Sequence, residues 1–164
     1  MVNSKLNGTL RQLDNGHFAL TFSRMLHIPI SDAWTAIADK EERDRWFHGM
    51  SFVNKVDGII RLDFGDEGMA TGSIISKNKP SELVHTLLWE DMPTSEVSWS
   101  FMPEDDSNTM VVLTHQNLTS GSIVDWAVGW HIILDDLTAY AEHKKAPLPD
   151  FEELGAYYSK QLAL

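Results

Sequence analysis

The longest apolar pattern in the chain runs over residues 121–143. Its large apolar residues recur in steps of three and four, the spacing of one face of an α-helix. They are Ile123, Trp126, Trp130, Ile133, Leu137 and Tyr140. Ser122 and Asp125 form a capping-box pattern at the start, Pro147 follows the end, and Gly129 inside the segment suggests close approach of a strand or a ligand. The pattern predicts a helix of roughly 33 Å, which needs a sheet to cover its apolar face.

A period of two, typical of half-buried strands, dominates the segments before this helix. Residues 9–13 and 17–28 flank Asp14-Asn15-Gly16, a turn sequence whose Asn-Gly pair accepts the positive φ angles of a tight hairpin. Arg24 interrupts the apolar face of the second arm, so it either reaches a carboxylate or contacts a ligand inside the fold. Further strands are predicted at 52–56, 59–64, 69–77, 82–90, 95–102 and 109–118. Together these segments predict a sheet of about seven antiparallel strands.

Two short helices are predicted directly after the first long strand. Ser31 is the expected N-cap of the first, which runs through Ala38, and the second begins near Asp39. The second helix is expected to expose a charged face and then to deliver Trp46 and Phe47 at its end. That face consists of Glu41, Glu42, Arg43, Asp44 and Arg45.

A short tail helix is predicted after Pro149, because Asp150 with Glu153 forms a second capping box. Its apolar stripe consists of Phe151, Leu154, Tyr158 and Leu162. The length of 164 residues suits one globular domain. We expect that domain over residues 1–146, with a hairpin arm at 9–16, and a tail helix within 147–164 that packs on the domain or on the partner in a homodimer.

Composition narrows the partners and the chemistry. The formal net charge is −11, from 13 basic and 24 acidic residues, so neither nucleic acid nor an anionic membrane is an expected partner. The chain has no cysteine, which excludes disulfides and thiolate chemistry. It shows neither a signal-peptide pattern nor an apolar run long enough to span a bilayer, so a soluble cytoplasmic protein is expected.

Several motifs resemble those of one known family. Residues 24–47, RMLHIPISDAWTAIADKEERDRWF, follow its pattern of Arg, apolar residues with Pro, Trp-x-Ala and a final Trp-Phe. Gly129-Trp130-His131 with Leu134-Asp135 and Leu137 resembles its Gly-Trp-His and Leu-Asp-x-Leu signature. Residues 109–115, TMVVLTH, resemble its penultimate strand.

Through these motifs the chain is similar to the activator of the heat-shock chaperone ATPase, a family of the START-like, or SRPBCC, helix-grip superfamily. Gly72 stands where this family carries a glycine before its long central strands. The chain departs from the family pattern at Lys40, Arg43 and Asp57. The resemblance implies an α+β fold in which a curved antiparallel sheet wraps around the long C-terminal helix. Two short helices would close one end, and a largely apolar cavity would lie between sheet and helix.

Function varies within this superfamily: members bind lipids, hormones or polyketides, some cyclise or hydrate such compounds, and one stimulates a chaperone. The resemblance therefore implies binding of a small hydrophobic ligand in the cavity. Two alternatives stay open. One is an enzyme of the cyclase, dehydratase or hydrolase type that uses a pocket histidine as general base. The other is a chaperone cofactor or another protein-interaction module.

The candidate site combines aromatic walls with a few polar groups. The expected ligand-binding residues are Arg24, Trp46, Phe47, His85, Trp89, Trp99, His115, Trp126 and Trp130. An imidazole can act as acid, base or hydrogen-bond donor near neutral pH, so His85 and His115 are the expected polar contacts. His131 is expected to make a surface hydrogen bond, and Asp135 and Asp136 to face solvent. No motif or ligand spacing predicts a cofactor or a metal, and no catalytic residue is assigned.

Overall fold

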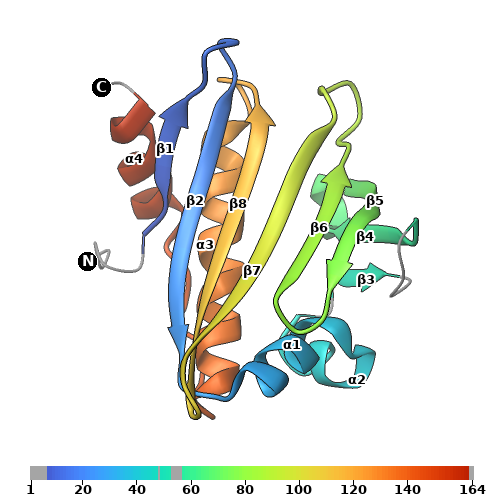
Figure 1. Ribbon diagram of the computed structural model, residues 1–164. Helices are drawn as coiled ribbons and strands as arrows, with labels where there is room; N and C mark the ends of the chain where they lie inside the picture. Colours follow the sequence, from blue (N-terminus) through green and yellow to red (C-terminus); the bar gives the residue numbers. More distant parts are fainter. Residues whose placement is uncertain (1–6, 48, 53–56, 163–164) are drawn as a thin grey trace.

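Eight strands form one antiparallel sheet in the described part of the chain, in the order β1-β2-β8-β7-β6-β5-β4-β3 (Figure 1). This computed structural model describes residues 7–47, 49–52 and 57–162, with backbone only at 51–52. The strands are β1 (Thr9–Gln12), β2 (Phe18–Leu26), β3 (Met50–Phe52), β4 (Ile59–Asp63), β5 (Met69–Asn78), β6 (Glu82–Leu87), β7 (Ser95–Asp105) and β8 (Asn108–Leu118). The expected helix-grip fold is confirmed, with eight strands where about seven were expected.

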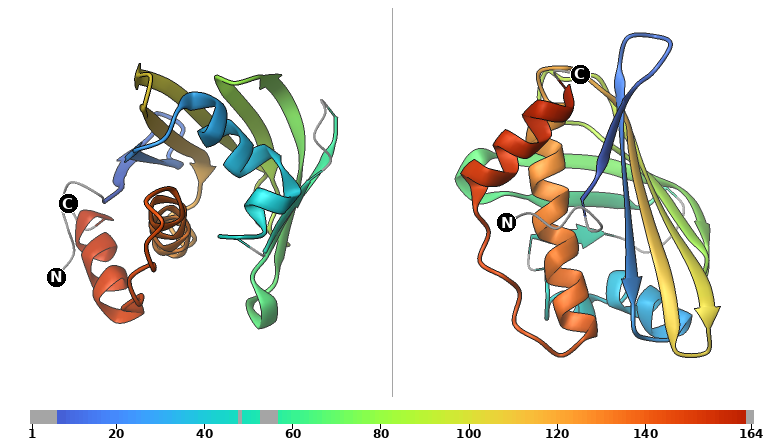
Figure 2. Two further views of the ribbon diagram at one scale, coloured as in Figure 1. Left: turned by 90° about the horizontal axis from the view of Figure 1, so that it is seen from below. Right: turned by 90° about the vertical axis from the view of Figure 1, so that its left-hand side faces the viewer.

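The helices of the described residues lie on the concave side and at the margins of the sheet. They are α1 (Ile30–Ala38), α2 (Lys40–Arg43), α3 (Ile123–Ala141) and α4 (Phe151–Leu162), and η1 (Gly65–Glu67) is a 3₁₀ turn. Figure 2 shows α3 inside the curve of the sheet, with α1 and α2 across one end. Helix α3 packs most closely on β2 and α4. Its Trp130 side chain reaches the middle strands, where it contacts His115 of β8 and Trp99 of β7.

The sheet bends at β5, which changes its partner along its length. Residues 69–73 pair with β4, and residues 74–78 pair with β6. A Cβ atom added at Gly72 would lie 1.8 Å from the carbonyl oxygen of Thr86. Only glycine allows two backbones to approach this closely. The glycine that the family resemblance singled out is therefore required by the bend that curves the sheet around α3.

The first hairpin closes in a different way from the one expected. The N–H of Leu13 donates to His17 O at 2.7 Å, and the N–H of Gly16 donates to Leu13 O at 3.0 Å. Within Asp14-Asn15-Gly16, Gly16 alone has a positive φ, 85°. The loop therefore has three residues, a type I turn followed by one left-handed residue, and not a turn with two left-handed residues. The strands that it joins pair as predicted.

Three further local expectations are wrong. Helix α1 begins at Ile30 with Pro29 as its N-cap, so Ser31 lies inside the helix instead of capping it. Ser122 makes no side-chain cap at the start of α3; the carbonyl oxygen of Thr119 instead accepts the N–H groups of Ser122 and Ile123, both at 3.1 Å. Arg43, expected on a solvated face, is 3% exposed. Its guanidinium donates to the carbonyl oxygens of Ile37 at 2.7 Å and Met50 at 3.1 Å. These acceptors replace the lost water, so the charge can be buried.

The tail helix α4 packs on its own chain, against α3 and β1. Tyr158 is fully buried, whereas Phe151 of the same apolar stripe is 66% exposed. The hydroxyl oxygen of Tyr158 accepts the N–H of Gly8 at 2.9 Å. The side-chain amide of Gln161 donates to Gly8 O at 3.0 Å and accepts the N–H of Leu10 at 3.1 Å. Helix α4 therefore holds β1 at the margin of the sheet (Figure 1).

Candidate functional site

Two indole–imidazole pairs occupy the core between the sheet and α3. Trp130 of α3 donates its indole N–H to Nδ1 of His115 in β8 at 2.9 Å. Trp99 of β7 donates its indole N–H to Nε2 of His85 in β6 at 3.1 Å. The two indoles meet edge to face with ring centroids 5.6 Å apart. These four fully buried side chains form one continuous indole–imidazole layer.

The hydrogen bonds of this layer fix the tautomer of each histidine. An indole nitrogen only donates, so Nδ1 of His115 carries a lone pair and the ring proton lies on Nε2, 2.7 Å from Ser95 Oγ. Ser95 in turn donates its hydroxyl proton to the carbonyl oxygen of Leu87 at 3.1 Å. In His85 the ring proton lies on Nδ1 and points to the carbonyl oxygen of Thr86 at 3.0 Å. Every ring nitrogen of both histidines is engaged.

Burial keeps both imidazoles neutral. Loss of solvation lowers the pKa of His85 to about 4, and the bond to the Thr86 carbonyl opposes this shift. The pKa of His115 is lowered to about 3, first by burial and then by the nearby His85. The lone pair that each ring keeps is already occupied by an indole N–H. Neither histidine therefore offers a free basic nitrogen for general base catalysis.

Three partly exposed aromatic side chains lie beside this layer and form what we call the aromatic mouth: Phe64 after β4, Trp89 after β6 and Trp126 in α3. Their ring centroids lie 5.7, 5.8 and 6.1 Å apart. Trp126 also stacks on Trp130 at 6.0 Å and meets the ring of His115 at 4.8 Å. The mouth therefore connects the surface with the buried layer through continuous ring contacts.

A small hollow opens at the aromatic mouth. Its volume is about 10 Å³, and its lining consists of Trp89, Met92, Pro93, Ser95, Asn117, Leu118, Thr119, Ser122 and Trp126. A space of this size holds about one water molecule. Behind it, His85, His115, Trp99 and Trp130 are all 0% exposed and thus touch no water-sized space. At these four residues the space expected to be an apolar cavity is filled by the side chains themselves.

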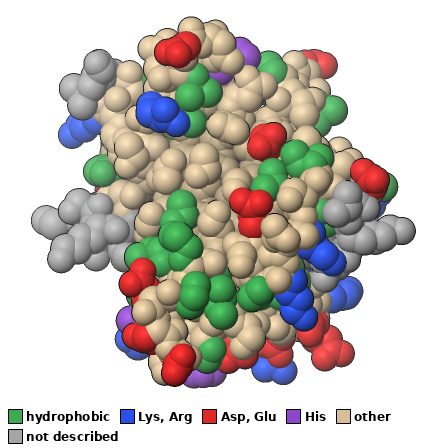
Figure 3. Space-filling view, in the orientation of Figure 1, with side chains coloured by type: hydrophobic (Ala, Val, Ile, Leu, Met, Phe, Trp, Pro, Cys, Tyr) green, Lys and Arg blue, Asp and Glu red, His purple; other side chains and the backbone are tan. Residues whose placement is uncertain are grey.

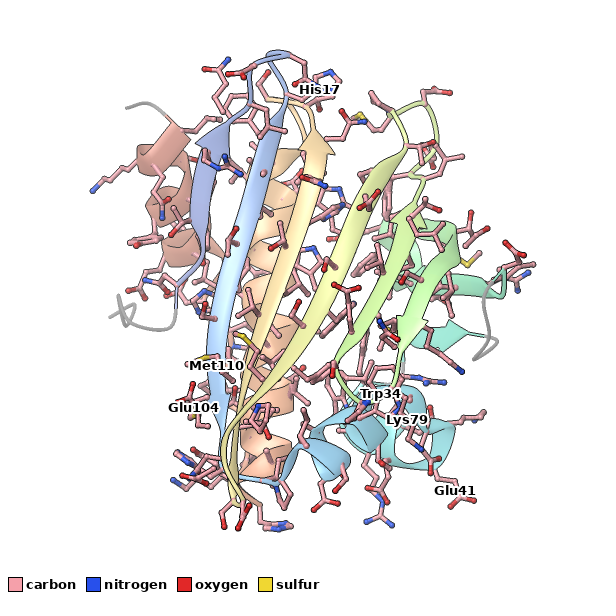
Figure 4. The ribbon with its side chains drawn as sticks, in the orientation of Figure 1. His17, Trp34, Glu41, Lys79, Glu104 and Met110 are labelled. Carbon is pink, nitrogen blue, oxygen red and sulfur yellow. The ribbon has the colours of Figure 1, made fainter. Side chains whose placement is uncertain are left out.

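The predicted site residues fall into separate groups. The structure brings together His85, Trp89, Trp99, His115, Trp126 and Trp130 in the layer and the mouth. Trp46 and Phe47 pack on each other with centroids 5.6 Å apart, and Trp46 donates its indole N–H to Ala36 O at 2.8 Å. This anchors them to α1, at the end of the sheet where Figure 4 labels Trp34. Among the described residues, neither makes a ring contact with the layer.

Arg24 lies on the side of α3 that faces α4. It is 1% exposed, and its Nη1 donates to Asp135 Oδ1 at 2.7 Å. Two expectations are wrong here. Asp135 is not a solvated residue but the partner of this buried charge, and His131 is buried, with Nδ1 2.8 Å from the Tyr158 hydroxyl. Burial lowers the pKa of His131, and the carboxylate of Asp135 opposes the shift. Helix α4 covers this face of α3, which the sequence pattern of α3 could not show.

Sequence reasoning missed two residues of the site, Phe64 and Ser95. Each carries a signal in the strand alternation. Ser95 has the same parity as Val97 and Trp99, which face inward along β7, and Phe64 has the same parity as Leu62 in β4. Extending each alternation by one step would have placed both side chains on the inner face.

A second, larger hollow of about 310 Å³ lies between α1, α2 and the C-terminal end of α3. Its lining consists of Ile28, Asp32, Thr35, Asp39, Glu42, Tyr140, Ala141 and His143. It contains none of the predicted site residues, and Glu42 already accepts the hydroxyl proton of Tyr140. Within residues 7–47, 49–52 and 57–162 no group of three or more His, Asp or Glu side chains could hold a metal ion. Over the same ranges, no helix is long and apolar enough to cross a membrane.

A curved antiparallel sheet around a long C-terminal helix, with aromatic side chains between them, defines a START-like helix-grip protein. Residues 27–142 match the family described as Activator of Hsp90 ATPase homolog 1-like protein, and the chain belongs to this family. The family resemblance of the sequence motifs is thereby confirmed. Strands β1 and β2 and helix α4 lie outside the matched segment.

Solved structures share the fold over most of the chain. CalU16 from Micromonospora echinospora has a TM-score of 0.76 at 22% identity and covers 96% of each chain. The conserved protein EF2215 from Enterococcus faecalis has a TM-score of 0.75 at 16% identity, over 95% of this chain and 90% of its own. PFC0360w, an HSP90 activator from Plasmodium falciparum, has a TM-score of 0.60 at 21% identity, over 68% and 86% respectively. No curated protein matches the chain. These likenesses establish the fold.

Proposed function

We propose that the protein binds a small, largely apolar aromatic molecule between the sheet and α3, at the aromatic mouth. The observation that supports this most is the convergence of Phe64, Trp89 and Trp126, from three separate elements, beside one hollow. Apolar and aromatic walls with few polar groups are typical of small-molecule sites. The family and the fold fit a ligand-binding protein.

Binding requires side chains to move, because the hollow of about 10 Å³ is much smaller than an aromatic ring. Met92 and Pro93 form the outer part of its lining, and both are exposed in the segment between β6 and β7. Trp89 and Trp126 are only partly buried. We expect these side chains to swing outward and the buried indole–imidazole layer to remain as the floor of the site.

Nuclear magnetic resonance of the wild-type protein tests this proposal, and one substitution in the mouth adds a second test. Each of the six tryptophans gives an indole N–H signal, and the signals can be followed during titration with neutral arenes such as naphthalene and 2-naphthol. We expect the signals of Trp89 and Trp126 to shift, and those of Trp34 and Trp46, at the α1 end, to stay in place. Trp89→Glu should abolish the shift of the Trp126 signal, because it places a charge in the mouth. No shift with any arene, or shifts at Trp34 and Trp46 only, would contradict the proposal.

The enzyme alternative has weaker support. It needs a pocket histidine with a free lone pair, whereas His85 and His115 both accept an indole N–H. The chaperone-cofactor alternative is supported by the family description. Among the described residues, no structural feature supports it as specifically as the aromatic mouth supports ligand binding.

A further inference from the structure

Ser95 is the most deeply buried polar side chain that lines the hollow. It is 6% exposed and lies on the inner face of β7, between the indole–imidazole layer and the aromatic mouth. Its hydroxyl therefore lies at the inner end of the path that a ligand would follow past Trp89 and Trp126.

The hydrogen bonds of Ser95 leave one acceptor lone pair of its hydroxyl oxygen unoccupied. Its only proton is given to the carbonyl oxygen of Leu87 at 3.1 Å. One lone pair of Oγ accepts the Nε2 proton of His115 at 2.7 Å, and that proton cannot leave Nε2 because Trp130 occupies Nδ1. A hydroxyl has one donor and two acceptor positions. What remains is a single acceptor lone pair, and the oxygen cannot rotate to become a donor without breaking the bond to Leu87.

The other polar side chains that line the hollow are less deeply buried than Ser95. Asn117 is engaged at both ends, since its Oδ1 pairs with His17 Nδ1 and its Nδ2 donates to Thr94 O at 2.7 Å. The hydroxyl of Thr119 donates to Ser122 Oγ at 3.0 Å, and the hydroxyl of Ser122 lies 3.4 Å from the carbonyl oxygen of Thr119. Among these lining side chains, Ser95 is the most deeply buried acceptor and the one that is hydrogen-bonded to the indole–imidazole layer.

We infer that Ser95 Oγ accepts a hydrogen bond from the bound molecule, so that the ligand class is arenes that carry a hydroxyl or N–H donor, phenols above all. This inference rests on the binding function proposed above and specifies its selectivity. An arene of the same shape without a donor leaves the Oγ lone pair buried and unpaired, and the desolvation of that lone pair is then not compensated. We expect a preference of about fivefold for the donor, the effect of one net hydrogen bond.

Two probes of nearly equal shape test this selectivity. 2-Naphthol carries the donor, and in 2-methoxynaphthalene a methyl group replaces its proton. Calorimetric titration of the wild-type protein should give the tighter dissociation constant for 2-naphthol. In Ser95→Ala the two constants should become equal, mainly because 2-naphthol binds less tightly. The matched control is Ser98→Ala, which lies on the same strand with the opposite parity and should keep the full preference.

Fold and ligand effects can be separated in this experiment. Ser95→Ala also leaves the Nε2 proton of His115 without an acceptor, so thermal unfolding must show that the variant is folded. If it is not, Ser95→Cys serves as the second variant, because its thiol is a weak acceptor of similar size. Equal affinity of the wild type for both probes, or a preference that survives loss of the hydroxyl, would overturn the inference while the proposed function stands. Failure of both probes to bind would overturn the proposed function as well.

Discussion

At the residue scale, burial keeps His85 and His115 neutral, and the indole N–H groups of Trp99 and Trp130 occupy the lone pairs of their rings. The pKa of His85 in the folded protein is about 4 and that of His115 is about 3, below the value of about 6.5 for a histidine in an unfolded chain. In acid the unfolded chain therefore binds protons that the folded chain does not. Stability is full above about pH 6.5 and falls as the pH decreases toward the folded-state pKa values.

We predict that His115→Gln weakens this dependence on pH. Between about pH 6 and about pH 4, the slope of the unfolding free energy against pH should decrease by about 1.4 kcal/mol per pH unit, the contribution of one proton. Urea unfolding at a series of pH values measures the slope. His27→Gln, which removes a histidine that is 60% exposed, is the variant for comparison. An unchanged slope in His115→Gln would contradict this prediction, because it would show that the imidazole of His115 is protonated in the folded protein as readily as in the unfolded chain.

Two glycines allow a second prediction at this scale. A Cβ added at Gly129 would meet nothing within 4 Å, so the close approach expected for this glycine is absent. Gly129→Ala should raise the unfolding free energy by about 1 kcal/mol, since alanine is the better helix former. Gly72→Ala should lower it by about 3 kcal/mol or more, because the added atom overlaps the Thr86 carbonyl. Chemical denaturation measures both; a loss of stability in Gly129→Ala would mean that the space beside it is needed.

The sequence predicted which residues are buried, but not how their side chains pair. The alternation in β6, β7 and β8 correctly placed His85, Trp99 and His115 on one inner face. It could not show that each histidine meets a tryptophan, because the partners are 14 and 15 residues apart. The expectation that Asp135 faces solvent is wrong because its partner Arg24 is 111 residues away, where no local pattern could reveal it. Period identifies a buried face, whereas pairing within that face depends on tertiary structure.

At the scale of elements, α4 and β1 depend on each other. The hydroxyl of Tyr158 accepts the Gly8 N–H and is hydrogen-bonded to Nδ1 of His131. Burial raises the pKa of Tyr158 to about 12, so the hydroxyl stays protonated and keeps both bonds. One side chain of α4 thereby links the chain before β1 with α3. Both of these peripheral elements lie outside the segment that matches the family.

We predict that Tyr158→Phe loosens β1 and α4 together. Loss of the hydroxyl leaves the Gly8 N–H and His131 Nδ1 without partners, which should cost about 2 kcal/mol of unfolding free energy. Hydrogen exchange should show faster exchange at the amides of Gly8 and Leu10. Tyr157→Phe, at the less buried neighbouring position, is the control and should leave these rates unchanged. Slow exchange in Tyr158→Phe would mean that β1 is held by its pairing with β2 alone.

The elements themselves were the most predictable feature of the chain. The period of α3 and the alternation of the strands predicted a long helix and an antiparallel sheet, since both patterns follow from which face is buried. The helix-grip arrangement of these elements followed from the family resemblance. Ends and turns were less predictable. The cap of α3 uses the Thr119 carbonyl instead of the Ser122 side chain, and the first hairpin has one left-handed residue instead of two. Several local geometries fit such sequences, and packing selects among them.

At the scale of the whole molecule, net charge acts on the ligand as well as on macromolecular partners. The formal charge is −11, and Figure 3 shows acidic side chains spread over one face of the molecule. The field of these charges extends about 8 Å into solution at physiological ionic strength. An anionic ligand that approaches the aromatic mouth meets this field, whereas a neutral one does not.

We predict that the protein prefers neutral arenes to anionic ones. 2-Naphthol should bind about tenfold more tightly than 2-naphthalenesulfonate at low salt, and the difference should shrink as added salt screens the surface. Titrations at several salt concentrations measure this. The affinity for 2-naphthol should stay nearly constant over the same range. A difference that does not change with salt would assign the discrimination to contacts within the site instead of to the net charge.

The ring contacts of the site have a spectroscopic consequence. Trp89, Trp126, Trp130 and Trp99 form an unbroken chain with centroid separations of 6.1, 6.0 and 5.6 Å. Indoles this close share their electronic excitations, so the four chromophores should give a coupled band in ultraviolet circular dichroism that isolated tryptophans lack. Swinging Trp89 or Trp126 outward would break the chain at its outer links and change that band. Circular dichroism of the unlabelled protein should therefore detect ligand binding through a change in this band.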